Sequence, residues 1–281
     1  MKSTIIGTLP LDPDRLAVEV EHIRQLHMQS TYSEFAFGRW ESCVLANRTG
    51  DVRDAAIYAY EGPAVSTAHG RDLPYLMSII EDSFDATHLK WARLFAVKNG
   101  VLISHRDYLE LPPGFVRLNV SLATDRTCLH SEEDTVFHMR VGEIWNLHVS
   151  AVHSGCSLSE FHRILLVMDF DLKDRPIEGL LAPSVRLEEP MEPLIIERPP
   201  LESEQLEALH SLSSIVNETN TRDVLQLLSK IHFYRQAGSQ SCHDWFCEIT
   251  RRSGNPRLHE KAVAFRRFCI EERRYGERFE W

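Results

Sequence analysis

The sequence has no two cysteines in a C-x-x-C arrangement, although its 281 residues include 6 cysteines. Zinc knuckles and thioredoxin-type redox motifs depend on that arrangement, so neither is expected. The sequence also lacks any apolar run near the ~18 residues that a membrane span needs. The apolar run after Met1 is interrupted by Gly7 and Pro10, unlike a secretory signal peptide. We therefore expect a cytoplasmic protein with reduced thiols and no membrane partner.

Positive charge is also scarce. Lysine and arginine number 31 against 41 aspartate and glutamate, which gives a net charge of −10. Because binding to phosphate backbones needs a basic surface, nucleic acid is not expected as a partner. Arginine pairs occur at 251–252, 266–267 and 273–274, and we expect them on the solvated faces of C-terminal helices. The sequence does not determine the oligomeric state, and a homodimer stays open.

The first part of the chain alternates apolar and polar residues with a period of two. Every second residue is apolar in FVRLNVSLA and in HRILLVMDFDL, as in strands with one buried face. LFAVKNGVLIS has Asn99-Gly100 between two apolar runs, which is a strong hairpin signal. TVFHMRVGEIWNLHV predicts two more short strands, broken at Gly142. The pattern predicts a mainly β body with helices (α+β), an antiparallel barrel or sandwich preceded by helices such as 14–27 and 72–81.

Composition changes over residues 186–202, where four prolines cannot continue a helix or a central strand. We interpret this stretch as a proline-rich linker. Beyond it, TRDVLQLLSKIHFY places its apolar residues on one helical stripe, with Asn220 as the expected N-cap. The predicted organisation is a β core with N-terminal helices over 1–185, the linker, and a small helical C-terminal domain over 203–281.

The stretch VLISHRDYLEL places His105, Arg106 and Asp107 behind an apolar run. A kinase catalytic loop needs asparagine five residues after the aspartate, and this sequence has Pro112 there. About one H-x-D is expected by chance in a chain with 14 histidines. In a strand, however, His105 and Asp107 point to the same face, so both can bind one metal ion.

A third metal ligand must come from another strand, and His153 is the best-placed histidine, with Arg163 ten residues later. Two histidines, one carboxylate and a later arginine are the parts of a non-haem Fe(II) site, because the three ligands leave three positions of the ion open. 2-Oxoglutarate fills two of these and dioxygen (O2) takes the third. An arginine suits the distant carboxylate of the keto acid. A zinc hydrolase with the same ligands and a metal-free, non-enzymatic ligand-binding β-barrel remain alternatives.

Several separated blocks of the sequence resemble the bacterial hydroxylases of free L-proline. They include TYSEFAFGRWESCVLANRTG, ISHRDYLEL, FVRLNVSLATD and TVFHMRVGEIWNLHVSAVHSG. The blocks occur in order in both the cis-4 and the cis-3 types, cover nearly the whole chain, and look closer to the cis-4 type. The resemblance implies a double-stranded β-helix (jelly-roll, cupin-like) core and a dioxygenase that depends on Fe(II) and 2-oxoglutarate.

The resemblance also implies site residues and a reaction. It assigns the catalytic iron ligands to His105, Asp107 and His153, and the carboxylate of 2-oxoglutarate to Arg163. The candidates for contact with the small-molecule imino acid are Arg117, His138, Arg93, Trp145 and Tyr32. The implied reaction hydroxylates a free cyclic imino acid, either L-proline, with the cis-4 position favoured, or its homologue L-pipecolic acid, and releases succinate and CO2. Attack at C3, or on another free amino acid, is an alternative.

Two departures from the family pattern bear on the substrate. Many 2-oxoglutarate enzymes have serine or threonine two residues after the arginine, where this sequence has Leu165. The carboxylate would therefore need another polar partner. Asn146 and His148 replace an aromatic residue and an acid of the cis-4 relatives, in a stretch that we expect close to the metal. This difference keeps the six-membered ring of L-pipecolic acid open as the substrate.

Overall fold

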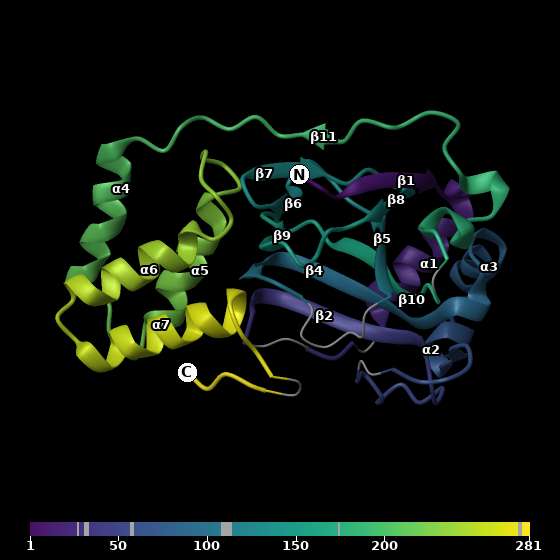
Figure 1. Cartoon of the computed structure of the whole chain (residues 1–281), viewed down its shortest axis with the longest axis horizontal. Helices are drawn as coiled ribbons and strands as arrows, with labels where there is room; N and C mark the ends of the chain where they lie inside the picture. The colour runs from purple at the N-terminus through teal and green to yellow at the C-terminus, as the bar shows by residue number, and fades with distance from the viewer. Residues whose placement is uncertain (27, 31–33, 57–58, 108–113, 174, 275–276) are drawn as a thin grey trace.

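The computed structural model describes residues 1–26, 28–30, 34–56, 59–107, 114–173, 175–274 and 277–281. This part of the chain forms an 11-stranded antiparallel sheet with helices at both ends (Figure 1). The strands are β1 Thr4–Thr8, β2 Ala36–Asn47, β3 Val65–Ser66, β4 Leu89–His105, β5 Phe115–Ala123, β6 Cys128–Glu132, β7 Thr135–His138, β8 Glu143–Asn146, β9 His153–Ser157, β10 Arg163–Asp171 and β11 Leu194–Ile195. Gly142 separates β7 from β8, as the sequence predicts.

Strand β4 is long enough to serve both halves of the sheet. Its residues 89–97 pair with β10, and its residues 100–105 pair with β9. One half runs in the order β8-β5-β10-β4 and the other in the order β4-β9-β6-β7. This is the order of a jelly roll, in which two Greek keys fold into two facing sheets. The predicted α+β class with a double-stranded β-helix core is confirmed.

The Asn99-Gly100 pair does not form the predicted hairpin, because β4 continues through both residues without a turn. Asn99 has a φ of 42°, and Gly38 on the facing strand β2 has a φ of 75°. The pairing register of β2 with β4 shifts between Phe37 and Arg39 at the same place. The backbone therefore forms a bulge that bends the strand from one sheet into the other. Asparagine and glycine favour positive φ in bulges as they do in turns, so the sequence signal alone was misleading.

The N-terminal helices cover the outer face of the first half of the sheet (Figure 1). They are α1 Pro13–Gln25, α2 Ala68–Arg71 and α3 Pro74–Ser83, close to the predicted 14–27 and 72–81. Glu19 of α1 is buried and accepts the backbone N–H groups of Tyr75 and Leu76 at 2.6 and 2.8 Å. This carboxylate satisfies the first turn of α3, which has no side-chain cap of its own.

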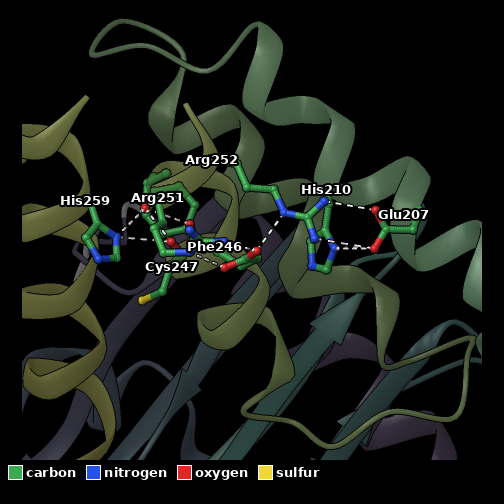
Figure 2. Close-up of polar contacts among 9 residues, drawn as sticks. Glu207, His210, Phe246, Cys247, Arg251, Arg252 and His259 are labelled. Atoms are coloured by element: carbon green, nitrogen blue, oxygen red, sulfur yellow. Dashed lines mark hydrogen bonds and ion pairs between the residues drawn. The ribbon is translucent and has the colours of Figure 1, made fainter. Parts of the chain in front are cut away.

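The C-terminal helices pack against the second half of the sheet. They are α4 Ser203–His210, α5 Thr221–Ile231, α6 Ser241–Arg252 and α7 Pro256–Ile270. Val101 and Ile103 of β4 share one hydrophobic core with Leu225, Phe246 and Phe265 of these helices. Figure 2 shows how Arg252 of α6 reaches Glu207 of α4, with 2.9 Å between Nη1 and Oε2. The helices are thus joined both to one another and to the barrel.

The N-terminus of α5 is at Asn220, as predicted, but its side chain makes no capping hydrogen bond. Its amide oxygen accepts the backbone N–H of Asn217 instead. Short 3₁₀ turns in the described part lie at Ala86–His88, Ile177–Leu180, Pro183–Val185 and Ser211–Ser214.

The proline-rich stretch 186–202 crosses the molecule from the barrel to α4 in an extended form (Figure 1). Within it, β11 pairs with β7 opposite Phe137 and His138. The division of the chain into a core, a linker and a separate helical domain stays a prediction. Among the described residues, no helix has the length and apolar character needed to cross a bilayer.

Candidate active site

His105 and His153 are brought together by strand pairing. His105 ends β4, His153 begins β9, and the two are cross-strand partners. Cross-strand partners lie closest of all side chains in a sheet, and here the ring centroids are 4.4 Å apart. Asp107 follows the end of β4, and the ligand atoms of the three residues all lie within 4.8 Å of one another. The predicted triad therefore converges on one point.

Backbone carbonyls fix which nitrogen each histidine presents. Nδ1 of His105 lies 2.8 Å from the oxygen of Ile103, and Nδ1 of His153 lies 3.0 Å from the oxygen of Ala151. Only a protonated Nδ1 can donate to a carbonyl, so in a neutral ring Nε2 carries the lone pair. Both Nε2 atoms face Asp107, at 3.3 Å and 3.9 Å from its carboxylate oxygens. This arrangement fits a metal ion, because metal-binding histidines commonly donate their other N–H to such a partner.

The charges around the triad favour metal-binding protonation states. Burial and the charge of His105 lower the pKa of His153 to about 4, so its imidazole is neutral near neutral pH. Burial by itself would raise the pKa of Asp107, but Arg117 and His105 outweigh it and hold this pKa well below its usual range. An ionised Asp107 carboxylate and a neutral His153 imidazole are donors that suit Fe(II).

Arg117 is held between two carboxylates. Its Nη1 contacts Asp107, while Nε and Nη2 donate to the two oxygens of Asp169 at 2.6 and 3.2 Å. Asp169 also accepts a hydrogen bond of 2.6 Å from Nη2 of Arg93 and is fully buried. The three residues come from adjacent strands, β5, β10 and β4. The sequence analysis did not single out Asp169, because only strand pairing places it between the two arginines.

Arg163 is the first residue of β10 and is fully buried. Its Nη1 donates to the carbonyl oxygens of Leu129 and Cys156 at 2.8 and 3.1 Å. Burial lowers the pKa of its guanidinium. Within the described residues its Nε has no hydrogen-bond partner, and none of the ion pairs that they form neutralises it. A buried cation with no counter-charge is costly, so this position suits an anionic ligand.

The triad, Arg117 and Arg163 all line one cavity of about 320 Å³. Such a volume is in the range of small-molecule sites. The other lining residues are Glu34, Phe35, Trp40, Ala55, Ala56, Phe95, Leu102, Asn119, His130, Leu147, Val149, Gly155, Leu165, Val167, Arg273, Glu277 and Arg278. The site therefore combines a candidate metal centre with two arginines in one cavity.

His130 and Asn119 are among the polar cavity residues that the sequence analysis did not predict. His130 of β6 is buried, and burial together with the charges of His153 and Arg163 lowers its pKa well below the usual range. A Cβ added at Gly155 would lie 3.5 Å from both Arg163 Nη1 and His130 Nδ1, so both side chains flank this glycine. Asn119 is buried on the same face of β5 as Arg117, and its amide nitrogen has no hydrogen-bond partner among the described residues. Alternation along β5 was the signal for Asn119, whereas no spacing rule pointed to His130.

Three of the candidate substrate residues do not line the cavity. Arg93 is buried and donates a hydrogen bond to Asp169. Nδ1 of His138 lies 3.0 Å from the carbonyl oxygen of Cys128. Trp145 is fully buried, and its indole N–H donates to Glu143 at 2.9 Å. The structure gives each of them a contact within the fold instead. Tyr32 lies outside the described residues. Arg117 is thus the candidate substrate residue that the described structure brings to the cavity.

Asn146 and His148, which depart from the pattern of the cis-4 relatives, also lie away from the cavity. Leu147 and Val149 line it, while Asn146 and His148 do not. His148 Nε2 lies 3.0 Å from the hydroxyl of Ser150. The stretch lies at the cavity as expected, but adjacent residues face opposite sides, so Leu147 and Val149 face inward and Asn146 and His148 do not.

The family model of the aspartyl/asparaginyl β-hydroxylases matches residues 12–172, and that of the L-proline 3-hydroxylase C-terminal region matches residues 181–277. Two solved structures are similar at low TM-scores. A 2OG-Fe(II) oxygenase family oxidoreductase from Burkholderia pseudomallei shares 13% identity over 61% of this chain and 84% of its own, with a TM-score of 0.38. The epimerase SnoN from nogalamycin biosynthesis shares 14% identity over 72% of this chain and 93% of its own, at 0.39. The two family models together place the chain among the hydroxylases.

Two relatives of the chain indicate a family within this class. An L-proline cis-4-hydroxylase from Rhizobium meliloti (strain 1021) is 36% identical over 280 residues, which cover 99% of each chain. L-Proline cis-3-hydroxylase 2 from a Streptomyces species is 35% identical, over 99% of this chain and 98% of its own. The chain therefore belongs to the L-proline hydroxylase family, and the predicted family is confirmed.

Proposed function

We propose that this enzyme hydroxylates a free cyclic imino acid, with L-proline at its cis-4 position as the first candidate and L-pipecolic acid as the second. One oxygen atom of O2 enters the hydroxyl group of the product, and the other enters the succinate that forms as 2-oxoglutarate loses CO2. The observation that carries the proposal is the single cavity shared by the triad, Arg163 and Arg117. A free amino acid and a keto acid are both small enough for such a space.

We assign the metal to His105, Asp107 and His153. The two Nε2 atoms and one carboxylate oxygen would hold Fe(II) on one side and leave the cavity side of the ion open. The bound ion supplies the site at which O2 is activated. The chain's own contribution is orientation, since the carbonyls of Ile103 and Ala151 keep both rings in the correct tautomer before metal arrives.

We assign the distant carboxylate of 2-oxoglutarate to Arg163. A carboxylate there would neutralise the buried guanidinium and satisfy its Nε. His130 flanks the same glycine as Arg163 and is a candidate for the second polar contact. It would take the place of the hydroxyl that other enzymes have where this chain has Leu165.

We assign the carboxylate of the imino acid to Arg117. Asp169 fixes the guanidinium at the cavity wall, and Nη1 of the same group contacts the candidate metal ligand Asp107. A substrate carboxylate bound there is held at a set distance from the metal. Which ring carbon is attacked then depends on how the cavity positions the ring.

The test is succinate release with a panel of free amino and imino acids, followed by NMR of the product. We expect turnover with L-proline or L-pipecolic acid, and none with the His105→Ala and Asp107→Ala variants, which should keep the circular dichroism spectrum of the parent. Turnover of aspartyl or asparaginyl peptides alone would contradict the proposed substrate class. Full activity of the parent in the presence of a strong chelator would contradict the metal site.

A further inference from the structure

The C-terminal region holds the backbone on both sides of His105. The carbonyl oxygen of Ser104 lies 2.7 Å from Nε2 of His243 in α6. The N–H of Arg106 donates to the carbonyl of Cys269 near the end of α7 at 3.0 Å. The carbonyl of Arg106 accepts a hydrogen bond of 3.1 Å from Nη2 of Arg273, just beyond that helix. All three contacts join the H-x-D segment to residues more than a hundred positions away in the sequence.

The peptide unit between Arg106 and Asp107 has hydrogen bonds at both its carbonyl oxygen and its N–H. The bond between Arg106 and Asp107 has its carbonyl on Arg273, and its N–H donates to the carbonyl of Val149 at 2.9 Å. A peptide unit is planar, so two such contacts set its orientation. The orientation of this unit determines the direction in which the side chain of Asp107 leaves the backbone.

Arg273 is buried, against our expectation that its arginine pair would be solvated. It is 6% exposed, and its guanidinium carbon lies 4.9 Å from the ring centroid of Phe35 and 5.4 Å from that of Phe268. Its Nη1 donates to the carbonyl of Phe268 at 3.4 Å. Phe35 in turn lies 5.4 Å from the ring of His105. Cation–π contact with both rings and two carbonyl acceptors give this side chain a defined position.

We propose that Arg273 is a positioning residue for the metal site: it fixes the peptide unit before Asp107 and so orients this carboxylate toward the two histidines. The inference rests on the proposed function, because it assumes that Asp107 binds the ion. All three candidate ligands come from the barrel, yet the residue that orients one of them comes from the C-terminal region. Metal ligands must be held to within ~0.5 Å, which packing and hydrogen bonds around them provide. The C-terminal region is therefore part of the metal centre.

The first measurement is metal affinity. Arg273→Met keeps an apolar side chain beside the two stacked phenylalanine rings but removes every donor. Metal-free protein is titrated with Mn(II), and the free ion is measured by its electron paramagnetic resonance signal. We expect the dissociation constant to rise about tenfold, the size of effect typical for residues that orient metal ligands. Arg267→Met is the matched control, because Arg267 is exposed on α7 and pairs with Glu272. It should bind Mn(II) as the parent does.

The second measurement needs no metal. Hydrogen–deuterium exchange of the Asp107 amide should be at least several-fold faster in metal-free Arg273→Met than in the parent or in Arg267→Met, because the peptide unit has lost one of its two contacts. Failure of the proposed metal site would appear as a parent that does not bind Mn(II). Failure of the present inference would appear as an Arg273→Met protein with parental affinity and parental exchange.

A third variant covers the case in which Arg273→Met does not fold. Arg273→Lys keeps a positive charge beside the two rings and a single donor group, but not the planar fork. We expect it to fold and to show smaller changes in the same directions as Arg273→Met. Parental values of both quantities in the folded lysine variant would overturn the proposal.

Discussion

At the scale of single residues, one buried carboxylate determines how the cavity is charged. Asp169 is shared by Arg93 and Arg117, and the same Arg117 reaches Asp107. The chain of contacts alternates in sign from Arg93 to Asp107. A buried group of this kind is stable only as a complete set, because removing one member leaves the others buried and unpaired.

Asp169→Asn tests this dependence. The amide keeps the shape of the carboxylate but cannot neutralise two guanidinium groups, so Arg117 should shift toward Asp107. We expect the KM for the imino acid to rise about tenfold, while the KM for 2-oxoglutarate changes little, because Arg163 makes no contact with Asp169 in the described structure. The free energy of unfolding should fall by about 3 kcal/mol, as is usual when a buried ion pair loses one partner. Steady-state kinetics and urea denaturation measure both.

The matched control is Asp171→Asn, two residues further along β10, where the carboxylate accepts the backbone N–H of Lys173. Its kinetic constants should match those of the parent. Equal KM values for the imino acid in Asp169→Asn and the parent would contradict the role of Asp169.

The residues that sequence reasoning found and missed differ in one physical respect. His105 and Asp107 are two residues apart in the sequence, so their convergence was predicted from the period of a strand. In the structure β4 ends at His105, and Asp107 lies just beyond it. His153 and Arg163 were chosen by their order along the chain, and strand pairing then explains their places. His130 and Asp169 are brought to the site by strands whose pairing the sequence does not state. Their roles therefore could not be predicted from spacing.

At the scale of elements, β4 decides the shape of the site. A single strand of 17 residues contributes to both sheets and ends in His105. The bend at Asn99 directs the last residues of β4 toward β9, where His105 pairs with His153. The sequence predicted two strands and a turn here. The two apolar runs were interpreted correctly as strands, but a bulge and a turn use the same residue types.

Gly38→Ala tests the bulge. A Cβ at this position would lie 2.1 Å from the carbonyl oxygen of Asn99, and the backbone has a φ of 75° that alanine rarely adopts. The steric clash adds to the cost of the positive φ, so we expect the free energy of unfolding to fall by about 3 kcal/mol. Urea denaturation followed by circular dichroism gives this value.

Gly62→Ala is the control for this substitution. Gly62 also has a positive φ, of 86°, but a Cβ there would meet nothing within 4 Å. It should lose only about 1 kcal/mol, the cost of the backbone conformation. A Gly38→Ala protein no less stable than Gly62→Ala would show that the bulge tolerates a side chain.

At the scale of the whole molecule, the barrel and the C-terminal helices meet across buried polar groups as well as apolar ones. His232, which follows α5, is fully buried, and its Nε2 lies 3.0 Å from the hydroxyl of Ser131 in β6. Ser239 joins the same contact, with 2.9 Å between the two hydroxyl oxygens. The sequence showed amphipathic helices but not this interface, because a helical stripe indicates that a face is buried without saying against what.

His232 should make the stability of the molecule depend on pH. Burial and the charge of Arg198 lower its pKa to about 3, whereas the unfolded chain should show a value near ~6.5. The unfolded chain therefore takes up the proton first as the pH falls, and stability is lost below the unfolded pKa. Between about pH 7.5 and about pH 5 this one group should cost about 2 kcal/mol.

His232→Gln removes the titrating group but keeps a side chain that can hydrogen-bond to Ser131. We expect a stability loss on acidification smaller than that of the parent by about 2 kcal/mol, measured by urea denaturation over about pH 7.5 to about pH 5. His22→Gln, which changes an exposed histidine of α1, should show the same loss as the parent. An equal loss of stability in His232→Gln and the parent would contradict this prediction. It would mean that water reaches His232 near neutral pH, so that the contact with Ser131 does not hold the barrel and the helices together.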